Sequence, residues 1–158
     1  MRAAIQALSL TLLALPALAA DRVALLPFEL MNTSLEPTRP DETERVLLLD
    51  RVVTQRMAEA GFAMVDPAPV EAEVAGISSL RGCNGCEQAL GRQLGADFVA
   101  IGWVQKVSNL ILNLNLQVRN VANGAIVAAG SVDIRGNTDE SWRRGALYLL
   151  EHRILPPG

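Results

Sequence analysis

The pattern of hydrophobic and polar positions divides the chain into a helical part and a part with strand-like alternation. A short apolar run at 22–29 (RVALLPFE) predicts a buried strand. Apolar side chains then recur at helical spacing, at Val46, Leu49, Val52, Val53, Met57 and Ala60. Asp41 and Glu44 have the spacing of a capping box at the start of this helix. A second apolar run follows at 62–66, and the order strand, helix, strand predicts that the two strands are parallel.

Beyond residue 97 the hydrophobic period changes to two, which predicts three antiparallel strands at 97–107, 110–121 and 125–135. The middle strand alternates strictly between apolar and polar side chains. Its apolar face consists of Leu110, Leu112, Leu114, Leu116 and Val118, and its polar face of Asn113, Asn115, Gln117 and Arg119. This alternation is typical of an antiparallel sheet that is covered on one face only.

Turn length decides the register of these strands, because a slip of one residue reverses every side chain. A two-residue turn at 108–109 would place Trp103 opposite Leu114, so that apolar side chains meet. A three-residue loop at 122–124 would place Val132 opposite Leu114, which again pairs apolar with apolar. We therefore predict these two loop lengths.

Two further helices complete the predicted fold. A short helix is expected at 86–94 and a terminal helix at 139–153, with an irregular stretch at 67–85. The inward side of the terminal helix is expected to consist of Trp142, Ala146, Leu149 and Leu150. The sequence thus predicts a single domain of the α/β (α+β) class. Its mixed sheet has the order β-α-β-(short α)-β-β-β-α, with the helices packed on one face.

Residues 1–19 have the three parts of a secretory signal peptide. Arg2 supplies the positive charge, 5–15 the apolar segment, and 17–19 (ALA) a small-x-small cleavage site. We expect this peptide to be removed and 20–158 to form one exported domain that is soluble in the periplasm. The apolar segment is shorter than the roughly 20 residues that a membrane-spanning helix needs, and no cysteine follows it for lipid attachment.

Composition argues against several classes of function. The formal net charge is −3, which disfavours nucleic acid or an anionic membrane surface as a partner. The chain contains no nucleophile elbow, phosphate loop or dinucleotide fingerprint, and His152 is its single histidine. We therefore predict neither enzymatic activity nor a cofactor.

Cys83 and Cys86 form a C-x-x-C pair and are the only cysteines of the chain. Haem attachment requires a histidine directly after the second cysteine, but Glu87 stands there. A closed zinc site needs four ligands, more than two cysteines and one distant histidine supply. Because exported proteins meet an oxidising compartment, a structural disulfide is favoured. A redox-active or metal-binding pair is the alternative.

Two groups of polar residues are candidates for a binding surface. The first is expected on one face of the three strands and comprises Lys106, Asn113, Asn115, Gln117, Ser131, Asp133 and Arg135. The second is the segment RGNTDESWRRG, with Asn137, Asp139, Trp142 and Arg143. Aromatic and arginine side chains often anchor interfaces. Each group also has a purely structural interpretation, as the solvated face of a sheet and as an ordinary helix start.

Several segments resemble known families. ALLPF in the first strand, the long amphipathic helix, GFAMVD and LGADFVAIGWV form one series. This series resembles the α/β domain of the curli-secretion lipoprotein, of the penicillin-binding-protein activator lipoproteins and of the N-terminal part of the Tol–Pal translocation protein. CNGCEQALGRQLGAD, GWVQKVSNLILNLN and RGNTDESWRRG more closely resemble an uncharacterised exported bacterial family. Some members of that family are encoded near periplasmic quinoprotein dehydrogenase systems.

The resemblance implies a non-enzymatic accessory or binding domain in the cell envelope. We therefore expect a periplasmic protein that binds another envelope protein, with thiol redox or metal handling at the two cysteines as the alternative function. The expected binding surface consists of Asn113, Asn115, Gln117, Asp133, Arg135, Asn137, Asp139, Trp142 and Arg143.

Overall fold

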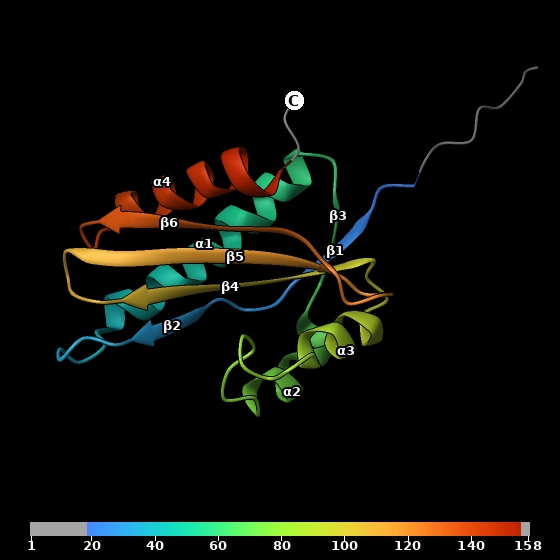
Figure 1. The fold of residues 1–158 in the computed structure, drawn as a ribbon, viewed down its shortest axis with the longest axis horizontal. Helices are drawn as coiled ribbons and strands as arrows, with labels where there is room; N and C mark the ends of the chain where they lie inside the picture. The colour runs from blue at the N-terminus through green and yellow to red at the C-terminus, as the bar shows by residue number, and fades with distance from the viewer. Residues whose placement is uncertain (1–18, 156–158) are drawn as a thin grey trace, which may run out of the picture.

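A computed structural model describes residues 19–155 as one domain built on a six-stranded mixed sheet (Figure 1). The strands are β1 (Arg22–Leu25), β2 (Glu29–Asn32), β3 (Ala63–Val65), β4 (Phe98–Lys106), β5 (Ile111–Asn120) and β6 (Ile126–Arg135). They are arranged in the order β3-β1-β4-β5-β6, and β2 pairs with β4 beyond the end of β1. The predicted signal peptide lies outside the described residues except for Ala19. The α/β class with a mixed sheet is confirmed.

Helices cover both faces of this sheet. They are α1 (Pro40–Glu59), α2 (Glu71–Ala75), α3 (Cys86–Gln93) and α4 (Asp139–Leu149), with short helical turns η1 (Ala68–Val70) and η2 (Leu150–Ile154). In Figure 1, α1 and α4 lie together on one side, whereas α2 and α3 lie on the other. No helix among the described residues has the length and apolar character needed to cross a bilayer.

The prediction that all helices pack on one face is therefore wrong for α2 and α3. The reason is that β1 is apolar on both sides. Val23 and Leu25 enter the core beneath α1 and α4, whereas Ala24 and Leu26 enter a second core beneath α3. A central strand that is buried on both faces needs a cover on each.

The predicted first strand is interrupted by a bulge. Leu25 lies opposite Ala100 and Glu29 opposite Trp103, so three residues of this strand span a gap that contains two residues of β4. Pro27 within the bulge has no N–H, and the N–H of Phe28 donates to the carboxylate of Asp50 on α1 at 2.9 Å. The extra residue turns Phe28 toward the core beneath α1.

The hairpin between β5 and β6 has the predicted central register. Leu114 lies opposite Val132. Closer to the turn a bulge shifts the pairing, so that Arg119 lies opposite Ile126, and the N–H of Asn120 donates to the oxygen of Ala125. The prediction from alternation therefore holds along the strands, but the predicted three-residue loop at 122–124 is wrong, because Asn120 rather than Val121 pairs with Ala125.

The predicted register between β4 and β5 is wrong by one residue. Trp103 lies opposite Asn115, whereas Leu114 lies opposite Val104. The connecting loop is longer than two residues, because the N–H groups of Val107 and Ser108 both donate to the oxygen of Ile111. Trp103 consequently shares the face of the amides, and Lys106 shares the face of the leucines.

Both long helices begin with side-chain caps. α1 uses Glu42 rather than the predicted Glu44, and the Glu42 carboxylate accepts a hydrogen bond from the N–H of Arg39 at 2.9 Å. α4 begins as predicted after Thr138, whose hydroxyl accepts from the N–H of Ser141 at 3.2 Å. These caps fix where each helix enters the core.

Candidate binding surface and cavity

One face of β5 and β6 carries polar side chains that remain accessible. This face lies opposite α1 and α4, and the second core covers only its β1 and β4 part. The side chains on β5 are partly exposed and those on β6 are exposed. We call them the polar sheet face; they are Asn113, Asn115, Gln117, Ser131, Asp133 and Arg135. The structure thus brings together the predicted strand residues, apart from Lys106.

The side chains of the polar sheet face hold each other in place. The amide of Asn115 donates to the side-chain oxygen of Asn113 at 2.6 Å. The amide of Asn113 donates across the strands to Ser131 and to Asp133, each at 2.9 Å. Such a network fixes the direction of the remaining donors and acceptors, so a binding partner would not have to order them.

The loop that contains the cysteines borders this face. Cys83 and Cys86 form a disulfide. Within the same loop the N–H of Leu80 donates to the carboxylate of Glu29 at 2.6 Å, and the side chain of Leu80 is buried in the second core. The guanidinium of Arg81 lies 5.7 Å from the ring centre of Trp103. The disulfide loop is therefore attached to the sheet beside the polar sheet face.

An ion pair connects α3 to the same region. The carboxylate of Glu87 is buried and lies 3.0 Å from the guanidinium Nε of Arg119 on β5. The amide of Gln88 donates to the oxygen of Val121 at 2.8 Å. These contacts hold the start of α3, and with it Cys86, against the end of β5.

The second predicted group, around RGNTDESW, does not form a continuous surface. Trp142 is fully buried and Asn137 is 8% exposed, so neither can contact a partner. Asp139 and Arg143 are exposed, and the Asp139 carboxylate lies 2.7 Å from the guanidinium of Arg45 on α1. The prediction that Asn137 and Trp142 belong to a binding surface is corrected, because both pack inward beneath α4.

A buried polar network accounts for the polar residues of that corner without a partner. The ammonium of Lys106 lies 2.6 Å from the carboxylate of Glu42, and both side chains are fully buried. The same carboxylate accepts from the amide of Asn137 at 2.6 Å. The oxygen of Asn137 in turn accepts from the indole N–H of Trp142 at 2.9 Å. All of these groups are paired, as buried polar groups must be.

Sequence reasoning did not identify this network. Lys106 is the only lysine in the chain, and its position at the end of a strand suggested a solvated face. Glu42 lies at the start of a helix, where an acidic residue is common without any buried partner. A single lysine beside a strictly apolar strand face was the one signal that pointed to a buried cation.

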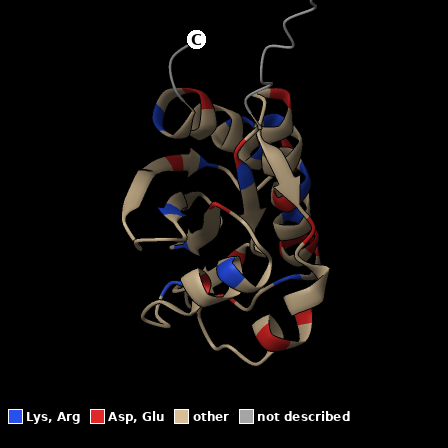
Figure 2. Ribbon diagram, turned by 90° about the vertical axis from the view of Figure 1, so that its right-hand side faces the viewer, with Lys and Arg blue, Asp and Glu red and all other residues tan. Residues whose placement is uncertain are grey.

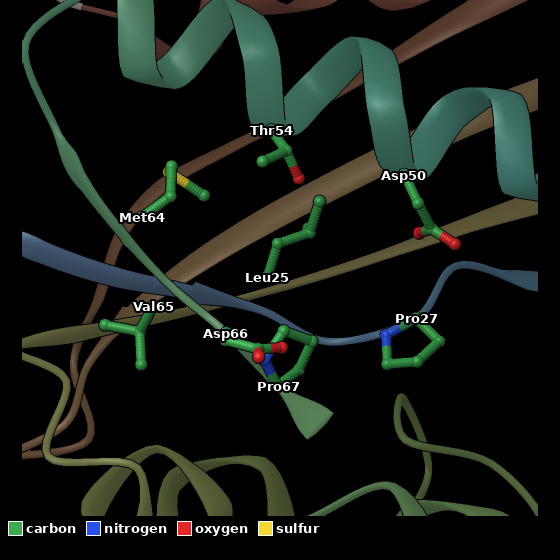
Figure 3. Close-up of a pocket in the computed structure, with 8 residues that line it drawn as sticks. All are labelled: Leu25, Pro27, Asp50, Thr54, Met64, Val65, Asp66 and Pro67. Carbon is green, nitrogen blue, oxygen red and sulfur yellow. The ribbon is translucent and has the colours of Figure 1, made fainter. Parts of the chain in front are cut away.

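A cavity of about 370 Å³ lies where β1 and β3 end beneath α1 (Figure 3). Figure 3 shows Asp50 and Thr54 projecting from α1 toward Leu25 and Pro27, with Asp66 and Pro67 beyond β3. The lining also includes Met64 and Val65. The ionisable groups in this lining are two carboxylates, so the cavity favours a cationic or hydrogen-bond-donating group.

Burial raises the pKa of Asp50, although the hydrogen bond from Phe28 and the charge of Arg51 act in the opposite direction. The ionised carboxylate therefore destabilises the folded state. This cost is absent well below the ordinary pKa and grows as the pH rises through the raised value. The same carboxylate also has a structural role, because its oxygen accepts from the Phe28 N–H that the bulge leaves without a partner on β4.

We expect Asp50→Asn to be more stable than the wild type at about pH 7, and the difference to shrink in acid at about pH 3.5. Asparagine keeps an oxygen acceptor for Phe28 but removes the desolvated charge. Asp50→Ala, which removes the acceptor as well, should instead lose about 1–3 kcal/mol. Thermal unfolding at the two pH values measures both effects. A constant difference between Asp50→Asn and wild type across this range would contradict the argument.

The residues described offer no assembled catalytic or metal centre. His152 is exposed, and its ring lies against that of Tyr148 in a tilted arrangement, with 4.4 Å between the ring centroids. Among the described residues the one group with metal-ligating geometry is Cys83, Cys86 and Glu87, and its two sulfurs are joined in the disulfide. Figure 2 shows positive and negative residues interspersed over the ribbon, without a large region of one sign.

Solved structures share this fold at low sequence identity. Lipoprotein GNA1162 from Neisseria meningitidis is 15% identical with a TM-score of 0.56, over 82% of this chain and 94% of that one. The PelC dodecamer from Paraburkholderia phytofirmans is 17% identical with a TM-score of 0.54, over 85% and 89%. The LpoB C-terminal domain from Salmonella enterica is 17% identical with a TM-score of 0.52, over 74% and 84%. The resemblance expected from the sequence is thereby confirmed at the level of the fold.

The chain is thus an α/β domain of the class seen in these bacterial proteins. It belongs to the family DUF3280, described as a protein of unknown function (DUF2380), which matches residues 21–154. No curated protein sequence matches the chain.

Proposed function

We propose that this chain is an exported accessory protein that binds another protein of the cell envelope through the polar sheet face. The observation that supports this most is the hydrogen-bonded row from Asn115 through Asn113 to Asp133. Asparagine is a poor strand former, so a row of amides on an accessible face needs another reason. Amide and carboxylate groups with fixed directions can recognise the polar groups of a partner.

The fold relatives support an envelope location. GNA1162 is a lipoprotein and PelC is a dodecamer, which favours a role in assembly or binding over catalysis. Together with the signal-peptide pattern at 1–19, this favours the periplasm as the place where the chain acts, soluble once the peptide is removed. The family resemblance makes a periplasmic quinoprotein dehydrogenase system the first place to look for the partner.

We expect the triple change Asn115→Ala, Asp133→Ala and Arg135→Ala to weaken capture of the native partner at least tenfold. Three polar contacts near the centre of an interface together exceed the roughly 1.4 kcal/mol that a tenfold change requires. The measurement is quantitative affinity capture from the native periplasm with the tagged, exported protein.

The matched control variant removes the same three kinds of side chain from the exposed side of α1. Glu44→Ala, Arg51→Ala and Gln55→Ala remove a carboxylate, a guanidinium and an amide from exposed positions. This control should capture the partner as well as the wild type. Equal capture by the sheet-face variant and the wild type would refute the proposed surface.

A further inference from the structure

β6 is an edge strand, and its outer side has a definite set of free backbone groups. The N–H of Val107 donates to Ile111, and the N–H of Gly136 donates to Leu110. These two bonds show that odd-numbered residues of β5 direct their N–H and C=O groups toward β4. Even-numbered residues direct theirs toward β6, because these groups alternate in direction along a strand. The register of the second hairpin then orients every residue of β6.

Even-numbered residues of β6 direct their N–H and C=O groups toward β5. Ala129, Ser131 and Asp133 therefore direct theirs outward. Within the described part of the chain, no strand or loop pairs with these outward groups. β6 consequently presents a row of donors and acceptors that a second strand can use.

The sequence of this edge is unprotected. Residues 126–132 (IVAAGSV) contain no charge and no proline, and Ile126 and Val127 are each 53% exposed. Proteins usually protect a long edge with proline, lysine, a charged side chain or a covering element. The uncharged, proline-free stretch at 126–132 lacks these devices, and we expect another strand to cover it.

We propose that β6 pairs antiparallel with β6 of a second copy of this chain, which joins two sheets across a two-fold axis. The charge pattern of the strand favours this occupant and this direction. Asp133 and Arg135 are its only charged residues, and both lie near its C-terminal end. Antiparallel pairing places them at opposite ends against uncharged residues, whereas parallel in-register pairing would align like charges.

An axis at Gly130 gives the most favourable register. Ala128 then lies opposite Val132 of the second copy, and Ala129 lies opposite Ser131, so that uncharged side chains meet on both sides of the axis. Ile126 and Val127, which are half exposed in the single chain, then lie beside the C-terminal end of the partner strand. The polar sheet face stays open in this dimer, so the dimer is independent of the proposed function.

Ala129→Pro tests the proposal because it removes one outward N–H and no bond to β5. Proline is tolerated at such positions of edge strands. The wild-type protein, exported with its own leader, should sediment as a dimer, and Ala129→Pro should raise the dimer dissociation constant at least tenfold. The control Ala129→Ser keeps the N–H group and should dimerise like the wild type.

A second variant tests the dimer independently if the proline variant fails to fold. Ser131→Asp keeps an acceptor for Asn113 but brings two carboxylates together near the axis, and it should also weaken the dimer at least tenfold. Far-ultraviolet circular dichroism checks that both variants fold. A wild type that stays monomeric up to about 1 mM, or a dimer that neither variant weakens, overturns the proposal.

Discussion

Replacing Lys106 by methionine is expected to lower the free energy of unfolding by about 3–5 kcal/mol. Methionine keeps an apolar stem of similar length, so packing is largely preserved. The loss arises because the carboxylate of Glu42 stays fully buried after its cation, 2.6 Å away, has been removed. Urea unfolding of the wild type and the variant measures the difference.

Two further variants make this expectation specific. Arg144→Met removes an exposed guanidinium that lies 3.5 Å from Glu140, and it should change stability by no more than about 0.5 kcal/mol. Adding Glu42→Gln to Lys106→Met removes both buried charges, so the double variant should lose less than the sum of the single losses. A loss below about 1 kcal/mol for Lys106→Met would mean that the buried carboxylate finds another partner.

The protonation of Glu42 agrees with this interpretation. Burial acts to raise its pKa, but hydrogen bonds from Lys106, the N–H of Arg39 and the amide of Asn137 outweigh it and hold the pKa below the ordinary value. A lowered pKa means that the pair stabilises the fold above the ordinary value and that this stabilisation is lost as the pH falls through the lowered one.

The buried network around Lys106 and Glu42 also affects the position of the polar sheet face. It joins the start of α1, the end of β4 and the turn between β6 and α4, which are brought together only by the tertiary structure. The strand that carries Asp133 and Arg135 leads directly into that turn. The buried ion pair therefore fixes the end of the polar sheet face as well as the core.

Local periodicity predicted most of the elements but could not predict one register. β5 alternates strictly, so its pairing with β6 follows from matching apolar side chains. β4 is apolar on both faces, with Ile101 and Trp103 on one side and Ala100 and Val104 on the other. Either register against β5 then places apolar beside apolar, and the pattern cannot distinguish them. The longer loop after Lys106 decides the register.

The candidate site was predictable where it depends on one strand pair and not where it depends on distant contacts. The amides of β5 and the carboxylate of Asp133 on β6 lie together as expected. Asn137 and Trp142 looked like surface residues because the side chains that hold Asn137 in the interior, Arg45 and Glu42, are remote in sequence. Asn137 bonds to Glu42, 95 residues away, and no local pattern indicates that contact.

Gly102→Val is expected to destabilise the fold by about 1–3 kcal/mol or more, because β4 and the bulge approach each other closely at this point. A Cβ atom at Gly102 would lie only 2.1 Å from the ring of Phe28. The ring cannot move aside easily. It is 5% exposed, and its backbone N–H is bonded to Asp50 at 2.9 Å. Thermal or urea unfolding of the single variant gives the size of the loss.

A compensating change tests whether the ring itself is the cause. Phe28→Leu alone should be destabilising because it leaves a gap above Gly102. Combined with Gly102→Val, the smaller side chain makes room for the new methyl groups, so the double variant should be more stable than Gly102→Val alone. Gly61→Val is the matched control, because no atom lies within 4 Å of a Cβ atom at Gly61. Gly61 has a positive φ of 98°, so any loss there comes from backbone strain, which Phe28→Leu cannot relieve. Strictly additive losses in the double variant would show that the ring does not set the limit at Gly102. Recovery would show that the bulge at Pro27 is accommodated only because residue 102 has no side chain.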